Sequence, residues 1–132
     1  LPSVTHLKKN VRDSYIDAHI PEDWIKLKQI IHTDFADYAD AFDKFERNHA
    51  MHFYNMFVAR SSFLQGYATW LFAVMEKLEM EIDPQGRTPF QARVFGFLSE
   101  RLFNVYLLKH SELKKRHMPV VQLYNESVIR PL

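Results

Sequence analysis

The 132-residue chain contains no cysteine, so it has neither a disulfide framework nor a thiolate metal site. No apolar run approaches the roughly 20 residues that a membrane-spanning helix needs, since the candidate at 67–75 includes Thr69 and is followed by Glu76. No charge sign dominates either, because 17 basic residues stand against 16 acidic ones. This balance argues against a nucleic-acid-binding protein, which would carry a continuous basic face.

Apolar and aromatic residues are abundant instead. Hydrophobic residues make up 47% of the sequence and aromatic residues 14%, which is typical of a packed globular protein. We therefore expect a single domain over residues 1–132, without internal repeats or linkers. Because the chain opens on "LPSVTHLKK" and without Met, we expect it to be a fragment or the C-terminal portion of a larger domain.

The spacing of apolar residues predicts five helices, and two further stretches predict strands. The expected helices cover residues 11–19, 21 to about 31, 33 to about 45, 62–82 and 88–110. The last two begin with capping boxes at 62–65 and 88–91. Residues 51–59 and 119–124 are rich in aromatic and β-branched residues and predict strands. The predicted fold class is α/β and predominantly helical, with about five helices and two or three short strands.

Aspartates at every third position of the third predicted helix suggest a solvated acidic face. Residues spread along an exposed helix lack the convergent oxygens that a cation needs, so we predict no metal site there. The positions concerned are Asp34, Asp37, Asp40 and Asp43. His49 and His52 lie three residues apart, but no third ligand is evident, and the chain as a whole yields no identifiable cofactor or metal site.

The segment "MHFYNMFVARSSF", residues 51–63, carries polar groups in an otherwise apolar stretch. In a strand, His52 and Asn55 would point to opposite faces. Asn55 is either a satisfied core amide or, because an amide both donates and accepts, a group that binds sugar hydroxyls. We predict Asn55 and His52 as substrate contacts under the second interpretation.

The helix at 93–108 carries a narrow polar seam of Arg93, Glu100 and Asn104, with Arg101 on its flank. A buried charge needs a partner, which Glu100 offers to Arg93 or to Arg101. The seam is therefore either an ion-pair network between helices or a site where guanidinium groups bind a phosphate-like anion. Gly96 costs about 1 kcal/mol in a helix interior, so we expect another backbone to approach it closely.

Two features near helix ends each allow two interpretations. His19 ends the first predicted helix and either interacts with the helix dipole or acts as a general base near neutral pH. The basic run "KHSELKKRH", 109–117, either complements a helix dipole or makes loose contact with an anionic membrane surface.

Several strings resemble a family of bacterial capsular and exopolysaccharide biosynthesis proteins. That family is labelled a domain of unknown function and is regarded as glycosyltransferase-like, related to the A-type nucleotide-sugar fold. The resemblance covers most of residues 12–124 and is most specific in "RVFGFLSERL". The matching positions are Tyr15, His19, Asp23, Asn55-Met56-Phe57, Tyr67, Trp70-Leu71-Phe72, Arg93 and Gly96-Phe97-Leu98-Ser99-Glu100-Arg101-Leu102.

The resemblance implies the C-terminal half of a glycosyltransferase that uses a nucleotide-sugar donor and a glycan acceptor. It implies a cytoplasmic location, at most peripheral to the inner face of the membrane. Full-length members carry an N-terminal half with the first strands of the nucleotide-binding sheet and a His-Tyr-Arg-Arg-like segment, which this sequence lacks. It also lacks the Asp-x-Asp motif with which related enzymes hold a divalent cation such as Mg or Mn.

Two functions from different classes follow. The first is sugar transfer, with His19 or Glu100 as the base, Arg93 and Arg101 as charge stabilisers, and Asn55 with His52 as hydroxyl contacts. The second is a non-catalytic helical interaction module, in which the seam is structural and the aromatic stripe at 35–45 is a docking surface. Exposed sheet edges in a fragment would favour self-association as a homo-oligomer.

Overall fold

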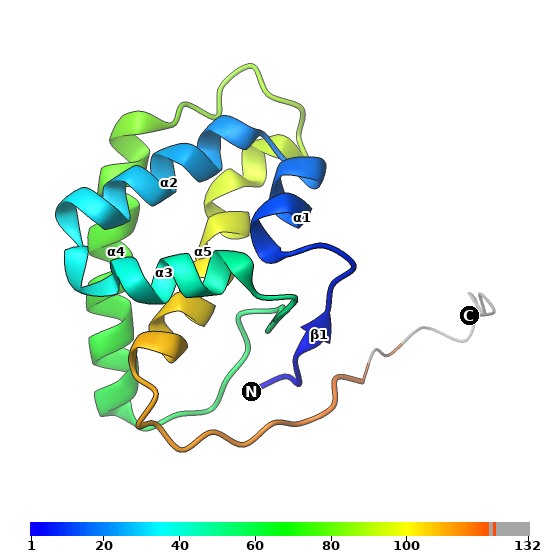
Figure 1. Ribbon diagram of the computed structural model, residues 1–132, viewed down its shortest axis with the longest axis vertical. Coiled ribbons are helices and arrows are strands. Elements are labelled where there is room, and N and C mark those ends of the chain that lie inside the picture. The colour runs from blue at the N-terminus through cyan, green and yellow to red at the C-terminus, as the bar shows by residue number, and fades with distance from the viewer. Residues whose placement is uncertain (122, 124–132) are drawn as a thin grey trace.

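The computed structural model describes residues 1–121 and 123, and it is predominantly helical (Figure 1). Within this part of the chain there are five α-helices, two short 3-10 helices and two strands of two residues each. In chain order the elements are β1 (Thr5–His6), α1 (Val11–Ala18), α2 (Pro21–Asp34), the 3-10 helix η1 (Ala36–Tyr38), α3 (Ala39–Arg47), β2 (Ala50–Met51), α4 (Ser61–Glu81), the 3-10 helix η2 (Gln91–Arg93) and α5 (Val94–Lys109). The predicted fold class is confirmed.

Helix α5 lies at the centre of the molecule, and the other helices surround it (Figure 1). Residues 101–107 of α5 are all buried, which explains why its sequence is apolar over most of its circumference. Helices α2, α3 and α4 pack against it, and α2 also packs against both α3 and α4. The largest fully buried side chains are Trp24, Tyr15, Phe42, Phe45 and Phe103. No helix among the described residues has the length and apolar character needed to cross a bilayer.

The N-terminal segment joins distant parts of the chain. Strand β1 pairs with β2 in an antiparallel register that places Thr5 opposite Met51. Pro2 forms a parallel bridge with Met118, in the segment that follows α5. Residues 1–7 therefore lie between the chain after α3 and the chain after α5, as Figure 1 shows.

Local chemistry explains most helix boundaries. Asn10 caps α1 by accepting from the backbone N–H of Asp13 at 2.8 Å. Pro21 occupies the first turn of α2, as predicted. Thr88 accepts from the N–H of Gln91 at 3.2 Å, so the second predicted cap forms, although the chain first makes η2 and enters α5 only at residue 94.

One predicted helix start and one predicted cap are wrong. The third helix does not begin at Thr33, because α2 continues to Asp34 and the chain then passes through η1 before α3 begins. The capping box at 62–65 does not form, since α4 already starts at residue 61 and its end has no side-chain cap. Exposure of this helix end lets water satisfy its N–H groups in place of a side chain.

The predicted strand at 51–59 is also wrong. Strand β2 ends at Met51, and residues 52–60 are irregular. The backbone turns at Tyr54, whose φ is 65°, so the stretch cannot continue as an extended strand. The second strand is predicted at 119–124. Residues 119–121 do not form a strand, and residues 122 and 124 lie outside the described part of the chain.

The glycine expected to allow close packing is also the wrong one. No atom lies within 4 Å of where a Cβ on Gly96 would be. A Cβ on Gly66, in α4, would lie 2.9 Å from the hydroxyl oxygen of Tyr106. Close approach of α4 to α5 therefore depends on Gly66.

Candidate functional site

The segment that follows β2 is attached to α5 by one buried side chain, Asn104. Its Oδ1 accepts from the backbone N–H of His52 at 2.8 Å, and its Nδ2 donates to the carbonyl of His52 at 2.9 Å. Nδ2 also donates to the carbonyl of Glu100 at 2.8 Å. The amide thus replaces a neighbouring strand, because it offers a donor and an acceptor side by side. The sequence placed Asn104 in the polar seam but missed this anchoring role.

His52 lies in this anchored segment, and its imidazole is buried. Its Nδ1 lies 2.6 Å from the carbonyl oxygen of Pro2, and its ring centre lies 5.0 Å from that of His117. Burial lowers the pKa of His52, although the hydrogen bond to Pro2 opposes the shift. In its neutral form the ring donates from Nδ1 and holds the N-terminal segment in place.

The turn at Tyr54 directs Asn55 toward the first half of α5. Asn55 is exposed, and its Nδ2 donates to Ser99 Oγ at 3.1 Å. Ser99 Oγ in turn donates to the carbonyl of Gly96 at 2.8 Å. Ser99 directly precedes Glu100 in α5, so the amide of Asn55 binds the residue next to the candidate carboxylate.

Arg101 is buried in α5 with little charge compensation. Its Nη1 donates to the carbonyl of Phe97 at 3.1 Å and to Glu100 Oε2 at 3.3 Å. Its Cζ lies 5.3 Å from the ring centre of Tyr15 and 5.7 Å from that of Phe53, where the ring faces attract a cation. Burial lowers the pKa of Arg101, and Glu100 opposes the shift. The guanidinium stays charged nonetheless and attracts anions.

Arg93 lies in η2, and its side chain does not pair with Glu100. Of the two ion pairs that the sequence left open for Glu100, the structure contains the one with Arg101. Arg93 is exposed, and its Cζ lies 5.5 Å from the ring centre of Phe97. Its fork of N–H donors therefore remains available to a ligand.

His19 follows α1 and packs among aromatic rings. Its ring centre lies 4.0 Å from that of Phe97, 4.7 Å from that of Tyr15 and 5.6 Å from that of Phe90. Burial lowers the pKa of His19, and the positive charge of Arg101 lowers it further. A lowered pKa keeps the imidazole neutral at pH 7, which is the form that accepts a proton.

An ion pair that the sequence analysis missed holds the loop beside His19. Arg87 donates to both carboxylate oxygens of Asp23, at 2.6 and 3.0 Å, and the Asp23 side chain is only 2% exposed. Gln91 Nε2 donates to the carbonyl of Ala18 at 3.0 Å. These contacts fix the loop that carries Phe90 to the ends of α1 and α2.

Of the six candidate residues, His52 is held by Asn104 and Pro2, and Asn55 contacts α5 through Ser99. The other four, His19, Arg93, Glu100 and Arg101, lie around the N-terminal half of α5. Phe97 connects them, because its ring packs on His19 and Arg93 while its carbonyl binds Arg101. Three buried atoms in this region have no hydrogen-bond partner among the described residues, namely Tyr15 OH, His19 Nδ1 and Arg101 Nε. This unused hydrogen-bonding capacity distinguishes the cluster from an ordinary core.

The acidic residues do not assemble a metal site in the part of the chain that the structure describes. No three His, Asp or Glu side chains gather there at positions suited to one ion. Asp43 instead lies 2.8 Å from His32 Nε2 and 3.7 Å from Lys28 Nζ, so it joins α3 to α2.

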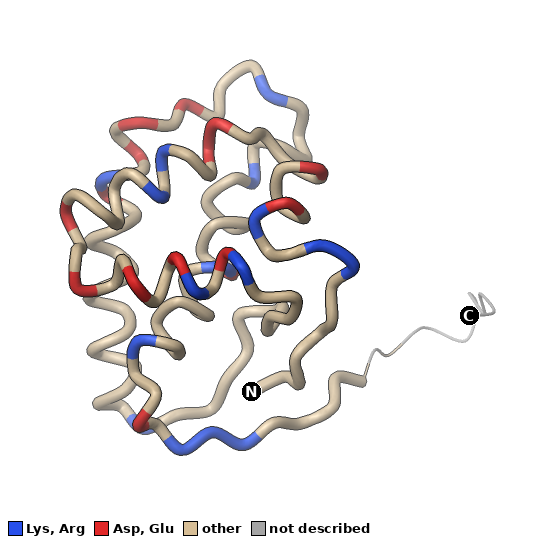
Figure 2. Tube along the Cα trace, in the orientation of Figure 1, with Lys and Arg blue, Asp and Glu red and all other residues tan. Residues whose placement is uncertain are grey.

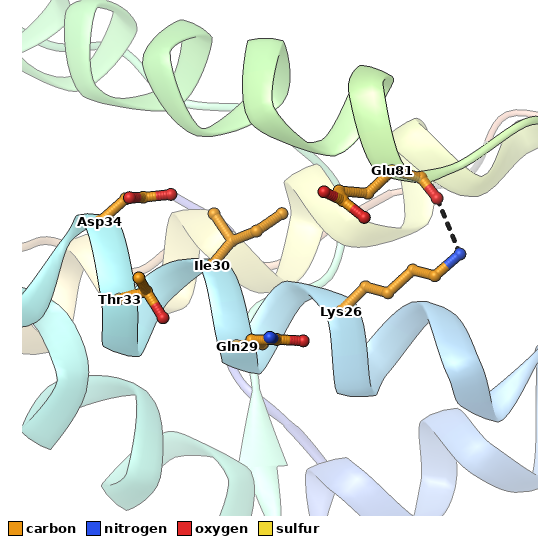
Figure 3. A pocket seen from close by; sticks show the side chains of 6 residues that line it. All are labelled: Lys26, Gln29, Ile30, Thr33, Asp34 and Glu81. Atoms are coloured by element: carbon orange, nitrogen blue, oxygen red, sulfur yellow. Dashed lines mark hydrogen bonds between the residues drawn. The ribbon is translucent and has the colours of Figure 1, made fainter.

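A small cavity of about 210 Å³ lies between α2 and the end of α4 (Figure 3). Lys26 crosses its edge and donates from Nζ to the carbonyl of Glu81 at 2.7 Å. This bond satisfies a carbonyl in the last turn of α4, where a cation is favoured by the helix dipole. Lys26 therefore has a structural role at this cavity, and none of the six candidate residues lines it.

A larger groove of about 990 Å³ lies at the C-terminal end of α5. Its floor is apolar and aromatic and includes Phe57, Phe63, Phe103 and Tyr106. Residues 57–63 form one wall and residues 110–118 contribute the other. None of the six candidate residues lines this groove, so the candidate site and the groove are separate features of α5.

Comparison with known proteins relates the chain to one family and one solved structure. The model of the family described as "Domain of unknown function (DUF4422)" matches residues 1–111. No match is found among curated proteins. The chain superposes on the apo structure of the bifunctional glycosyltransferase WbbM with a TM-score of 0.80 and 25% identity. The match covers 89% of this chain and 22% of that one, so the chain spans about a fifth of the larger protein.

Proposed function

Because the chain belongs to the DUF4422 family of domains of unknown function, and shares its fold with part of a glycosyltransferase, we propose that it is a portion of a glycosyltransferase. The complete protein transfers a sugar from a nucleotide-sugar donor to a hydroxyl group of a glycan acceptor. We place this reaction in the cytoplasm, in the biosynthesis of a capsular or exported polysaccharide. The proposal rests on the structural likeness together with the cluster around Phe97.

The reaction defines what the side chains must do. The acceptor oxygen forms a bond to the anomeric carbon of the donor sugar, while the bond from that carbon to the diphosphate breaks. The proton of the acceptor hydroxyl passes to a base, and negative charge grows on the departing nucleoside diphosphate. The barrier falls when a base and cationic donors stand ready at these two places.

The cluster around Phe97 offers groups for both tasks. His19 is neutral at pH 7 and Glu100 is a carboxylate, so either is suited to accept the proton. Arg93 presents to the diphosphate an exposed guanidinium that forms no ion pair with a described residue, and buried Arg101 adds positive charge behind it. Asn55 is exposed beside Ser99, the residue before Glu100, and is suited to contact acceptor hydroxyls, with His52 supporting its segment.

The observation that carries this assignment is the poorly compensated charge of Arg101. A guanidinium buried between two aromatic rings, with one carboxylate contact and a buried Nε that lacks an acceptor, is costly for a purely structural residue. An anionic substrate nearby would supply the missing charge. The described residues do not offer ligands for a divalent cation, so the Mg or Mn used by related enzymes would need ligands from elsewhere in the complete protein.

The test is a donor screen on the complete gene product. It is incubated with a panel of nucleotide sugars and an extract of cellular glycans, and release of nucleoside diphosphate is measured. We expect release with one donor, and a loss of at least about tenfold in the rate for Glu100→Gln and for Arg93→Gln. Lys77→Gln, which removes an exposed cation of α4 distant in sequence from the cluster, is the matched control and should leave the rate unchanged.

The second candidate is a non-catalytic interaction module. Two observations favour it. His52 binds the carbonyl of Pro2, and none of the six candidate residues lines the cavity or the groove described above. Under this alternative, the Glu100 and Arg93 variants would leave sugar transfer by the complete protein intact. That result would remove the catalytic assignment of the cluster.

A further inference from the structure

The groove at the C-terminal end of α5 is bordered by exposed aliphatic side chains. Val58, on the wall before α4, is fully exposed at 101%. Met118, on the opposite wall, is 62% exposed, and Val121 and Leu123 beyond it are 76% and 92% exposed. Isolated exposed apolar residues are common, but here they flank an apolar groove. An apolar phase is therefore expected to cover this edge of the molecule.

The same edge is basic. Arg60 stands on one wall and Lys114, Lys115 and Arg116 on the other, and none of these four forms an ion pair with a described residue. Figure 2 shows this basic run along the chain that follows α5. Among the described residues that line the groove, Glu112 is the single acidic one. Residues 47–75, which include the first wall, contain no Asp or Glu at all.

We propose that this edge docks on the surface of an anionic lipid bilayer. The cations would lie at the level of the phosphate groups, and the exposed aliphatic side chains would enter the boundary with the acyl chains. Since no described helix can cross a bilayer, the contact is on the surface. This inference is independent of the proposed sugar transfer.

Two other occupants fit less well. A second copy of the chain, related by a two-fold axis, would bring the same cations against one another. A nucleic acid would match the four cations but would leave Val58, Met118 and the apolar floor without a partner. An anionic membrane surface satisfies both the charge and the apolar side chains.

The first test is co-sedimentation of the 132-residue chain with vesicles of phosphatidylcholine, with or without phosphatidylglycerol. We expect binding only to the anionic vesicles, decreasing as salt increases. Replacing Lys114, Lys115 and Arg116 by Gln should weaken binding about 100-fold, because each of the three cations near such a surface contributes about fivefold. The control replaces Lys8, Lys44 and Lys77 by Gln, which removes the same charge from exposed positions away from the groove.

A second test asks whether the apolar side chains enter the bilayer. Val58→Trp places a fluorophore at the fully exposed position, and Phe72→Trp places one at a 64% exposed position of α4 outside the groove. We expect anionic vesicles to shift the emission of the first variant to shorter wavelength, relative to the wild type, and to leave the second unchanged.

Three outcomes would overturn the proposal. They are an absence of binding to anionic vesicles, equal weakening by the two charge-matched triple variants, and the same emission shift at both tryptophan positions. The circular dichroism spectrum of each variant is compared with that of the wild type, so that a loss of binding is interpreted only for a folded protein. All the substituted side chains are exposed or intermediate in burial, so we expect these variants to fold.

Discussion

At the scale of single residues, two asparagines differ in what they do despite their shared chemistry. Asn104 is buried and makes three hydrogen bonds to backbone groups, two of them to His52. Asn55 is exposed and makes one hydrogen bond, to Ser99. The first fixes the course of the chain and the second is available to a ligand, so the two substitutions should separate stability from function.

We predict that Asn104→Ala lowers the free energy of unfolding by about 2–3 kcal/mol, because it leaves the buried N–H and carbonyl of His52 without partners. Urea unfolding followed by circular dichroism measures the change. Asn55→Ala is the matched control and should change stability by less than about 0.5 kcal/mol. An Asn104→Ala protein as stable as the control would show that the anchoring bonds contribute nothing.

Buried His52 and half-buried His19 predict a pH dependence of stability. Burial lowers the pKa of His19 and of His52 in the folded protein, whereas in the unfolded chain it is about 6.5. The unfolded state therefore binds more protons as pH falls through this value, and the free energy of unfolding should decrease between pH 7 and pH 5. His19→Gln should reduce the slope of this decrease, measured by urea unfolding at several pH values. An unchanged slope would contradict the burial of His19 as its cause.

Sequence reasoning singled out His19, Arg93, Glu100 and Arg101 as candidates but not the contacts that bring them together. The pattern within α5 placed Glu100 beside Arg101, because local spacing in a helix fixes which side chains are neighbours. It did not find the Asp23–Arg87 pair or the contact of His19 with Phe97. Those contacts join residues more than 60 positions apart, and one sequence contains no information on such pairs.

At the scale of elements, the helices were predictable and the strands were not. Helices α1, α2 and α4 begin and end within three residues of prediction, because periodicity and Pro21 act locally, whereas α5 begins six residues later than predicted. The stretch at 52–60 has the composition of a strand. Yet the backbone N–H and carbonyl of His52 bond to the side chain of Asn104 in α5 and not to another strand. Its irregular form thus depends on tertiary contacts that composition does not reveal.

The two helical glycines offer a matched prediction. Gly96→Ala in α5 should raise the free energy of unfolding by up to about 1 kcal/mol, because alanine favours the helix and nothing lies near the new methyl group. Gly66→Ala in α4 should lower it, because the methyl group would lie 2.9 Å from the hydroxyl of Tyr106. Thermal unfolding of both variants measures the difference.

The clash explanation has its own control. In a Tyr106→Phe background the hydroxyl oxygen is absent, so Gly66→Ala should become neutral or stabilising, like Gly96→Ala. A double-mutant cycle on the free energies of unfolding detects this coupling. If Gly66→Ala is equally destabilising in both backgrounds, the contact with Tyr106 is not its cause.

At the scale of the whole molecule, the two proposed sites lie at opposite ends of one helix. The candidate cluster surrounds the start of α5, and the groove lies at its end. The helix rises about 1.5 Å per residue, so residues 93 and 110 are separated by about 25 Å. Docking at the groove would therefore leave the candidate site at most roughly that far from a bilayer surface.

This arrangement requires the chain to behave as one rigid unit, which leads to a prediction about cooperativity. Trp24 packs against Tyr15 and Phe42 in the contact of α1, α2 and α3, whereas Trp70 packs against Tyr38 and Tyr106 where α4 meets η1 and α5. Because α5 contacts α2, α3 and α4, both tryptophans should report the same transition.

Two single-tryptophan variants, Trp24→Phe and Trp70→Phe, make this measurable. In each variant the urea midpoint from the fluorescence of the remaining tryptophan should coincide with the midpoint from circular dichroism. Stability differences between the variants do not matter, since the comparison is made within each protein. Midpoints that separate in either variant would mean that one end of α5 unfolds before the other, and that the two ends belong to separate folding units.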